Sequence, residues 1–582
     1  MYEWNKLPWR KLEKQVFKLQ KRIYRASQRG DVKTVHRLQK LLLKSWSAKC
    51  LAVRKVTQDN QGKKTAGVDG IKNLTPQQRL LMVNKLKLTS KASLTRRVWI
   101  PKPGKAEKRP LGIPTMEDRA RQGLAKLALE PEWEARFEPN SYGFRPGRGC
   151  HDAIDAIFKL TNRKPKYVLD ADVEKCFDRI NHEALVKKIG TFPLLRRALC
   201  AWLKAGVLDG DSIFPTQAGT PQGGVISPLL ANIALHGLER TIQNAFPATI
   251  KRDGQIIQLW KPQVIRYADD LVVIHQDLSV IQKCQEIINQ WLHEIGLTLK
   301  PEKTRITHTL DPINGQAGFD FLGFNVRQYR TTNKRNNKGF HVLIKPSQES
   351  IKRHYHNLSV IVERHKAAPQ RALIDHLNPV IRGWCNYYST AVSKRLFAKL
   401  DHMLFNKLKS WAKRRHSQKS SYWAMDKYWG VNRGLGWTFC TTDKAKLLNH
   451  SDTPIIRHIK VKGTASPYDG DWSYWASRTG KHPELPSRVA KLLKQQKGKC
   501  PFCGLYFGMD DLIEVHHKDQ NRSHNQLNNL VLLHRHCHDQ IHNDITSHAK
   551  GTHDKSHSVE EPDEGKLSCP VLKTSSNGDI VA

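Results

Sequence analysis

Long apolar runs are missing from this chain of 582 residues. A helix that crosses a bilayer needs about twenty consecutive apolar residues, and no window of that length is both uncharged and apolar. We therefore expect no membrane span. The first residues are basic but lack the apolar core of a signal peptide, so we expect no secretory signal either.

Closely spaced cysteines are also scarce. The 11 cysteines are scattered along the chain, and the one close pair is Cys500 and Cys503. A disulfide scaffold instead concentrates many cysteines in a short secreted chain. The pattern therefore favours a reducing cytosol and a single metal site, and we expect a cytoplasmic protein.

Acidic residues are few relative to basic ones. The 53 Asp and Glu residues face 97 Lys and Arg residues, which gives a formal net charge of +44. An excess of this size indicates a polyanionic partner, with a merely soluble basic surface as the alternative. The basic residues run along the whole chain between Trp and Tyr residues, which is typical of an extended nucleic-acid track. The length predicts several domains.

Two adjacent carboxylates lie near the middle of the chain. The run Val264–Ile274 predicts an apolar strand, a tip carrying Asp269 and Asp270, and a second apolar strand. Neighbouring carboxylates repel each other unless a cation lies between them. Paired divalent metals held by carboxylates clamp the oxygens of phosphoryl transfer. A bare Asp-Asp hairpin is more often a solvated turn, but here two upstream motifs favour a metal site.

The first of these motifs is the acidic strand Tyr167–Val173, in which Asp170 and Asp172 share one face by the period of two. The second is the glycine-rich turn Gly219–Pro228, which predicts the opening of a helix. Acidic strand, Gly-Thr-Pro-Gln-Gly turn and Tyr-Ala-Asp-Asp hairpin, in this order, resemble the palm of a reverse transcriptase.

The resemblance extends along nearly the whole chain, to about residue 545. Further blocks are Arg97–Gly104, Arg109–Pro114, Tyr142–Arg148, Gly296–Thr304, Phe319–Phe324 and Arg382–Tyr388. Together they resemble the blocks of a bacterial group II intron-encoded protein. That family combines a reverse transcriptase, an RNA-splicing maturase, a DNA-binding segment and an endonuclease. The resemblance implies three partners, namely the protein's own intron RNA, a double-stranded DNA target and dNTPs. It also implies a location in the bacterial cytosol, associated with the nucleoid.

The expected fold is a multidomain α+β chain. It comprises a right-hand polymerase with fingers and palm on an antiparallel sheet, a three-helix thumb, and a small ββα-metal HNH module with zinc. Apolar residues that recur at helical spacing, for example Leu373, Leu377 and Ile381, predict the helices of the thumb. The expected segments are a basic helical N-terminal extension (1–70), fingers and palm (71–340), a thumb or maturase segment (341–430), a DNA-binding segment (431–492), an HNH endonuclease (493–545) and a disordered tail (546–582).

The resemblance also implies roles for polymerase residues. Asp172, which lies five positions before Phe177, would share two Mg²⁺ ions with Asp269, and Asp270 would complete the triad. Phe177 matches a steric gate against the ribose 2′-hydroxyl. The resemblance gives nucleotide-binding roles to Lys102, Arg109, Gln222 and Lys303. Lys303 would protonate the leaving pyrophosphate, with an ordinary surface lysine as the alternative.

The C-terminal region predicts a structural zinc site. Cys500 and Cys503 are followed about thirty residues later by His534 and Cys537. Four thiolate or imidazole ligands are the number that a closed tetrahedral zinc site takes.

Between the zinc pairs lies a second set of histidines that resembles an HNH nuclease. His538 and His542 are four residues apart, so they share one face of a helix. With His516 they would hold one divalent ion, and His517 would point to the other side of the strand as the general base. Asn529, by family match, would orient its imidazole. His524 and His536 are extra candidates. The alternative is a zinc ribbon that binds DNA without cutting it.

Two other hypotheses compete with the interpretation as a group II intron-encoded protein. One is a free-standing reverse transcriptase, which usually lacks an HNH module. The other is an RNA-binding maturase without catalysis, against which the intact Tyr-Ala-Asp-Asp motif and the complete histidine set argue.

Overall fold

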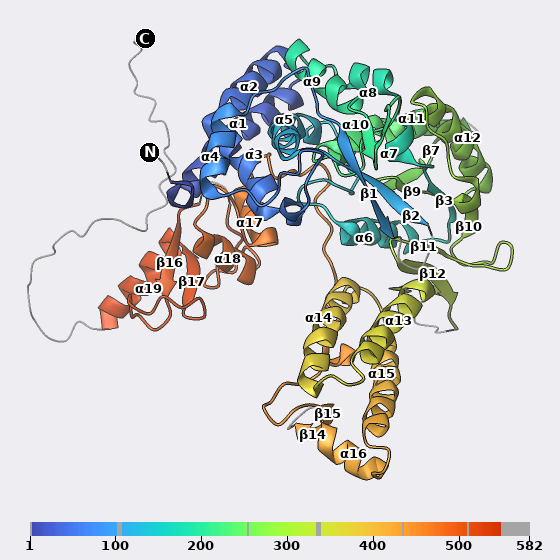
Figure 1. Cartoon of the computed structure of the whole chain (residues 1–582), viewed down its shortest axis with the longest axis vertical. Helices are drawn as coiled ribbons and strands as arrows, with labels where there is room; N and C mark the ends of the chain where they lie inside the picture. Colours follow the sequence, from blue (N-terminus) through green and yellow to red (C-terminus); the bar gives the residue numbers. More distant parts are fainter. Residues whose placement is uncertain are drawn as a thin grey trace, which may run out of the picture.

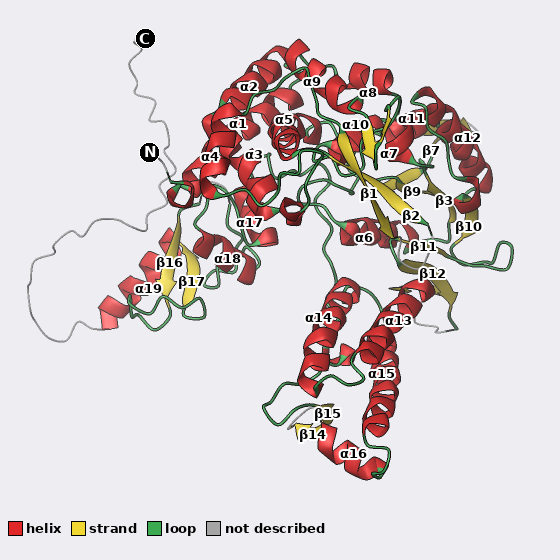
Figure 2. Ribbon diagram, in the orientation of Figure 1, coloured by secondary structure: helices red, strands yellow, loops and turns green. Residues whose placement is uncertain are grey.

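The computed structural model describes residues 3–101, 107–252, 255–332, 339–432, 436–508 and 511–548. A large upper body carries the N-terminal helices, fingers and palm, and a helical arm projects from it (Figure 1). A smaller C-terminal module lies beside the N-terminal helices. Strands gather in the body and in this module, whereas the arm is mostly helical (Figure 2). No helix of the described residues is both long and apolar enough to cross a membrane. The expected tail lies outside the described residues from position 549.

The N-terminal layer is helical, as expected for the N-terminal extension. Apolar residues of its first long helix are buried, with Leu12 4% and Ile23 0% exposed. The short helix α4 follows a capping box in which Thr75 and Gln78 each accept a hydrogen bond from the other's backbone N–H. The elements are η1 (Trp4–Lys6), α1 (Trp9–Gln28), α2 (Val32–Lys44), α3 (Trp46–Arg54), η2 (Lys55–Asp59), η3 (Gln61–Lys64) and α4 (Pro76–Lys85).

The fingers contain a four-stranded sheet in the order β2-β1-β4-β5. The expectation of an antiparallel sheet is wrong here in one pair, because β1 runs parallel to β4. Residues 114–206 separate β2 from β4 in the chain, which gives the connection length that a parallel pair needs. The strands are β1 (Thr95–Pro101), β2 (Lys108–Ile113), β4 (Val207–Asp209) and β5 (Ser212–Phe214).

The palm sheet has the order β10-β3-β9-β8 and is antiparallel throughout. Its strands are β3 (Tyr167–Asp172), β8 (Gln263–Tyr267), β9 (Asp270–His275) and β10 (Arg305–His308). A separate hairpin joins β6 (Thr249–Arg252) and β7 (Gln255–Gln258). The helices of fingers and palm are α5 (Met116–Glu134), α6 (Cys150–Thr161), α7 (Cys176–Arg179), α8 (His182–Ile189), α9 (Pro193–Leu203), α10 (Ser227–Ala234), α11 (Leu238–Asn244), α12 (Leu278–Glu294) and η4 (Pro301–Lys303).

The arm begins after a three-stranded sheet of β11 (Phe319–Phe321), β12 (Phe324–Arg330) and β13 (Phe340–Pro346). Three helices follow at the positions predicted for the thumb, with Leu373 and Leu377 fully buried. The elements are α13 (Gln348–Arg364), α14 (Gln370–Tyr388), α15 (Lys394–Arg415), α16 (Ser421–Tyr428), β14 (Trp429–Asn432), β15 (Gly436–Phe439) and η5 (His450–Asp452).

The chain then returns from the thumb to the body and enters the C-terminal module (Figure 1). The segment expected to bind DNA, 431–492, is divided between two packing units. Phe439 and Val461 belong to the core shared by palm and thumb, whereas Val489 belongs to the core of the C-terminal module. The elements of this module are α17 (Trp472–Thr479), α18 (Ser487–Gln495), β16 (Ile513–His517), β17 (Leu530–His534) and α19 (Arg535–His548).

Candidate polymerase and metal centres

The three predicted catalytic carboxylates come together at one end of the palm sheet. Asp172 is the last residue of β3 and is directly opposite Asp270, the first residue of β9. Asp269 lies in the turn between β8 and β9, and its carbonyl accepts a hydrogen bond from Val173 N at 3.3 Å. The predicted hairpin is therefore present, and the second acidic strand lies beside it.

Buried polar groups hold the turn that carries Asp269. Arg266, which is 3% exposed, donates to the Asn232 side chain at 3.0 Å and to the Ala268 carbonyl at 3.1 Å. Asn232 in turn donates to the Gly143 carbonyl at 2.7 Å. A Cβ at Gly143 would lie 2.3 Å from Ala268 N, so this position must be glycine for the turn to approach. Sequence reasoning missed Asn232 and Arg266, because neither forms part of a metal-ligand pattern.

The electrostatics of the cluster favour a bound cation. Burial raises the pKa of Asp270 to about 7, with further contributions from the charges of Asp269 and Asp172. Burial also raises the pKa of Asp269. Lys303 forms an ion pair with Asp172. Clustered carboxylates with raised pKa values are ligands for hard divalent cations, so the donor set fits the predicted magnesium site.

Asp170 has a different partner from Asp172. Its carboxylate accepts a hydrogen bond from Arg305 Nε at 3.0 Å. Burial nevertheless raises its pKa to about 6. The arrangement supports the choice of Asp172, because Asp172 is the residue that lies opposite Asp270. A polar cavity of about 310 Å³ lies against this cluster and is lined by Asp170, Asp172, Asp270, Lys303 and Arg305, among others.

Two of the predicted nucleotide-binding residues line a second cavity. It has a volume of about 360 Å³ and is lined by Phe177 and Gln222, together with residues of β1, β2 and the β5 loop. The amide of Gln222 donates to both oxygens of Asp178, at 3.1 and 3.2 Å. Arg109 lies on β2, paired with Ile100, but it is not among the residues lining this cavity. Lys102 lies outside the described residues.

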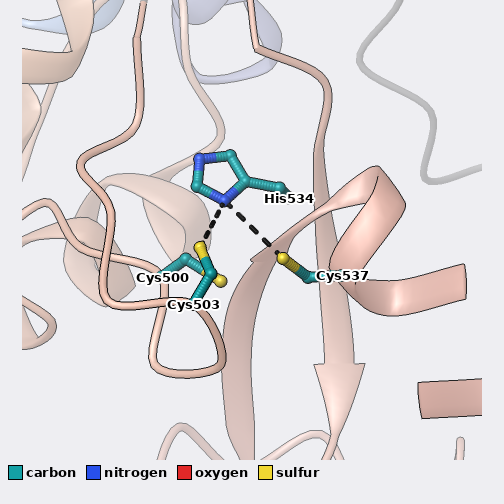
Figure 3. Close-up of side chains that lie close together, drawn as sticks. All are labelled: Cys500, Cys503, His534 and Cys537. Atoms are coloured by element: carbon teal, nitrogen blue, oxygen red, sulfur yellow. Dashed lines mark hydrogen bonds between the residues drawn. The ribbon is translucent and has the colours of Figure 1, made fainter. Parts of the chain in front are cut away.

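The four predicted zinc ligands meet in the C-terminal module (Figure 3). Cys500, Cys503, His534 and Cys537 place one ligand atom each within 4.8 Å of the others. His534 Nδ1 lies 3.4 Å from Cys503 Sγ and 4.0 Å from Cys537 Sγ. Three sulfurs and one imidazole nitrogen are a set that fits tetrahedral zinc.

A carboxylate outside this set orients His534. Asp511 Oδ2 lies 3.3 Å from His534 Nε2 and accepts a hydrogen bond from Gly508 N at 2.6 Å. Contact at Nε2 leaves Nδ1 for a metal, which is the usual arrangement of a metal-binding histidine. No sequence spacing identified Asp511, because a supporting carboxylate has no fixed distance from its ligand in the chain.

The second histidine set forms its own cluster. His516, His538 and His542 place their ligand atoms within 4.8 Å of one another. His538 and His542 lie on α19 with ring centroids 4.5 Å apart, as their spacing predicts. His538 Nδ1 also lies 3.0 Å from a carboxylate oxygen of Glu514. Of the two extra candidates, His536 stacks on His534 and His524 pairs with Asp519 at 2.6 Å.

The expectation that Asn529 orients His517 directly needs correction. Among the described contacts, His517 Nε2 lies 3.3 Å from Asn525 Oδ1. Asn529 instead donates to Asp519 Oδ1 and to the His524 carbonyl, at 2.7 and 2.9 Å. His517 pairs with Leu530 across the hairpin, so the preceding Asn529 faces the loop that closes the hairpin. Its side chain holds this loop, and the loop presents Asn525 to His517.

Three parts of the chain match known families. Residues 100–326 match "Reverse transcriptase (RNA-dependent DNA polymerase)", residues 4–86 match "N-terminal domain of reverse transcriptase", and residues 351–429 match "Group II intron, maturase-specific domain". The carboxylate cluster and its glycine-rich turn lie in the first of these ranges.

Related proteins agree with these matches. Protein YkfC of Escherichia coli is 32% identical over 336 residues, which cover 51% of this chain and 84% of that protein. The group II intron-encoded protein LtrA of Lactococcus lactis is 28% identical over 51% of this chain and 60% of its own length. An uncharacterized 91 kDa protein in the cob intron of Schizosaccharomyces pombe is 30% identical over 52% of this chain and 44% of its own length. The chain thus spans less than two thirds of the last two relatives. With its reverse transcriptase and maturase-specific domains in this order, the chain belongs to the group II intron reverse transcriptase/maturase family.

Proposed function

We propose that this protein copies its own intron RNA into DNA, assists the splicing of that RNA, and nicks the DNA target from which copying starts. The observation that carries the proposal is the direct pairing of Asp172 with Asp270 beside Asp269 at one end of the palm sheet. Separate parts of the chain would bind the nucleotide, the RNA and the DNA.

The polymerase chemistry rests on the positions of the carboxylates. Divalent ions bound to them would stabilise the attacking and leaving oxygens of nucleotidyl transfer. Asp172 and Asp269 would bind the ions, and Asp270 lies opposite Asp172 across the sheet and next to Asp269 in the chain. The Lys303 ammonium pairs with Asp172, and in this proposal it would give a proton to the leaving oxygen. Phe177 and Gln222 line the neighbouring cavity, where an incoming nucleotide would bind.

The maturase activity rests on the thumb. Its apolar stripes pack inward, and α15 turns a row of cations outward. Exposed on this helix are Lys394, Arg395, Lys399, Lys409, Lys413 and Arg414. Such a row binds RNA through its phosphates, and it lies on the arm far from the carboxylate cluster (Figure 1). Splicing assistance therefore does not need the polymerase metals.

The nuclease activity rests on the histidines of the ββα unit. A divalent ion bound by His516, His538 and His542 would stabilise the charge on the cleaved phosphate. His517 follows His516 on β16, and its Nε2 atom contacts Asn525. In this proposal its imidazole takes a proton from the attacking water. A zinc module that only binds DNA is the second candidate. The existence of a histidine cluster beyond the four zinc ligands favours cutting.

One experiment tests the proposal as a whole. The purified full chain with its co-purifying RNA is given dNTPs, Mg²⁺ and a pool of random-sequence DNA duplexes, and nicked and extended strands are sequenced. We expect nicks in a shared sequence context, each followed by cDNA of one RNA. Asp269→Ala should reduce cDNA to background while splicing assistance and nicking persist, because one carboxylate that would hold both ions is gone.

The matched control is Asp211→Ala, which removes an exposed carboxylate from the β4–β5 turn. It should leave all three activities unchanged. Wild-type cDNA synthesis by Asp269→Ala would overturn the assignment of the polymerase centre. Extension without any nicking by the unaltered protein would instead favour the DNA-binding zinc module.

A further inference from the structure

The sheet at the base of the arm ends in an edge strand. Its strands lie in the order β11-β12-β13, so among the described strands β13 has a neighbour on one side. The sheet lies where the arm leaves the body (Figure 1). Unpaired N–H and C=O groups along such an edge are a template for a further strand. The surroundings of this edge therefore decide what can bind there.

A large cavity lies along β13. It has a volume of about 1000 Å³ and is lined by five successive residues of the strand, 340–344. Side chains of a strand alternate between its two faces, so a cavity that contacts five residues in a row lies at the edge of the strand. The other lining residues come from α6 and the residue after it, from residues 390–394 and from the segment 455–459. We call this cavity the edge groove.

Part of the backbone edge is open. Opposite residues of an antiparallel pair either exchange both of their backbone hydrogen bonds or neither. Gln328 of β12 is opposite Val342, but it donates its N–H to the Thr309 carbonyl at 2.8 Å. The N–H and C=O of Val342 therefore point away from β12, toward the groove. Within the described part of the chain, no backbone group bonds to them.

Ile344 shows how this edge binds a neighbouring chain segment. It lies two residues beyond Val342 and turns its backbone groups to the same side, where its carbonyl accepts a hydrogen bond from Val392 N at 2.8 Å. Residue 392 thus occupies one end of the edge. The remaining residues, 340–343, extend over about 14 Å at about 3.4 Å per residue, which matches about four residues of a partner strand.

Aliphatic side chains line the groove and are open to solvent. Val392 is 53% exposed, Ile455 39% and Ile459 78%, and all three line the groove. Apolar side chains that gather at one exposed place mark a binding surface. Nucleobases stack on aromatic rings, whereas branched aliphatic side chains pack against other aliphatic side chains. These residues therefore favour a partner with apolar side chains.

The charges around the groove are mainly positive. Lys159, Lys394 and Arg457 line it, and Asp155 is the one acidic residue among the described lining residues. Asp155 pairs with Lys159 at 2.7 Å. The Lys394 ammonium donates to the backbone carbonyl of Ser451, a contact that does not neutralise its charge. The positive charge at Lys394 and Arg457 complements acidic groups on a partner.

We propose that the edge groove binds an extended peptide segment of another protein, with aliphatic residues at alternate positions and acidic residues at its ends. The segment adds a strand to β13, and its backbone pairs with that of Val342. Its aliphatic side chains pack against Ile455 and Ile459, and its carboxylates lie near Lys394 and Arg457. None of these residues is a predicted metal ligand, so the inference does not depend on the proposed function.

The test begins with a displayed library of random nine-residue peptides, which is selected on the full chain with its co-purified RNA. We expect the selected peptides to share alternating aliphatic residues and acidic ends. A peptide of the consensus sequence is synthesised, and its dissociation constant is measured by fluorescence anisotropy. Its binding should slow the hydrogen exchange of residues 340–344, because the Val342 N–H is then paired.

Three variants and a control examine the contacts separately. Val342→Pro removes an outward N–H, which an edge strand tolerates, and should weaken binding about three- to tenfold. Ile459→Asp and Arg457→Glu change exposed side chains, and each should weaken binding about fivefold or more. Arg457→Glu should also bind a peptide with lysine ends more tightly than the unaltered protein does. Arg240→Glu, the same charge change at an exposed position of α11, should have no effect.

Thermal unfolding shows whether each variant keeps its fold, and the two exposed positions keep the test decisive if Val342→Pro unfolds. Selected peptides without a shared alternating pattern would overturn the inference. So would equal affinities of Arg457→Glu and Arg240→Glu together with unchanged exchange of residues 340–344. The cations of α15 begin at Lys394, so the exchange is also measured after RNase treatment. Faster exchange of residues 340–344 once the RNA is removed would assign the groove to RNA instead.

Discussion

The Nε2 atoms of His354 and His450 lie 2.9 Å apart in the interior of the thumb. His450 Nδ1 contacts Asp401 at 2.7 Å, so its Nδ1 carries the proton and its Nε2 accepts one from His354. Trp384 stacks on the His354 ring with centroids 4.5 Å apart. One chain of polar contacts therefore joins α13, α15 and η5 inside the core of the thumb.

The contacts between His354, His450 and Asp401 predict that the free energy of unfolding of the thumb falls at acidic pH. Burial lowers the pKa of His354 to about 3, and the charge of His450 adds to the effect. Because its folded pKa lies below the unfolded value of about 6.5, the folded state favours the neutral ring. The contribution of His354 to the free energy of unfolding is therefore fully present above about pH 6.5 and is lost as the pH falls toward 3. Between pH 7 and 5.5 we expect a loss on the order of 1 kcal/mol, measured by thermal unfolding.

The matched variant for this prediction is His354→Gln, which keeps a polar side chain but cannot titrate. It should be less stable at pH 7.5 and should lose less stability than the unaltered protein between pH 7 and 5.5. An equally steep loss of stability in the variant would assign the acid sensitivity to other groups.

Phe177 supports a prediction about sugar selection. Its ring lines the cavity beside Gln222 and touches Phe144 edge to face at 6.1 Å. If the ring excludes the ribose 2′-hydroxyl, Phe177→Val should relax the preference for dNTPs over rNTPs by about tenfold or more, because one steric contact contributes a factor of this size. Steady-state incorporation of dCTP and CTP opposite guanine measures this preference.

The control variant is Phe144→Val, which removes the neighbouring ring but keeps Phe177. It should retain most of the discrimination between dNTPs and rNTPs. Equal effects of both variants would make Phe177 an ordinary packing residue.

The C-terminal module allows its two metal sites to be separated. Cys500→Ser should release zinc and unfold the module, since a closed site contributes directly to the folding of a small domain. His517→Ala should keep zinc and the fold but lower the rate of nicking by roughly 10²–10⁴-fold, the usual contribution of a general base. Zinc content and nicking are measured in parallel, with Cys200→Ser as the cysteine control. Zinc loss in His517→Ala would mean that a structural ligand has been taken for a catalytic residue.

The cations of α15 predict how RNA binding depends on salt. Affinity for the co-purified RNA should fall at least about tenfold between roughly 0.1 and 0.5 M KCl, because Lys and Arg release counterions from the phosphates. The pair Lys409→Gln and Lys413→Gln should reduce the logarithmic salt slope by about 1.4, or about 0.7 for each phosphate contact on single-stranded RNA. Filter binding measures both. A flat salt dependence would exclude the +44 charge as the main source of affinity.

Much of this protein is determined locally by its sequence. The apolar runs on either side of Asp269 and Asp270 predict the hairpin that the structure contains, and the apolar stripes of the thumb predict α13, α14 and α15. The two Cys/His pairs predict a four-ligand cluster, and the structure brings all four together. In each case the signal lies within a few residues or in a ligand spacing, where the side-chain period of strands and helices is decisive.

Other features are decided only by the tertiary structure, because they depend on residues that are far apart in the chain. The parallel pairing of β1 with β4 closes a long connection that local periodicity does not encode. Asn525, rather than Asn529, contacts His517 because the register of β16 and β17 turns Asn529 toward the hairpin loop. Lys21 of α1 forms an ion pair with Glu484, which lies 463 positions away in the chain, and a single ion pair leaves no pattern in the sequence around either residue. The sequence by itself thus determined the chemical groups and the local elements that carry them. The three-dimensional packing decided which distant groups support the predicted catalytic residues, because such contacts join parts of the chain that share no local pattern.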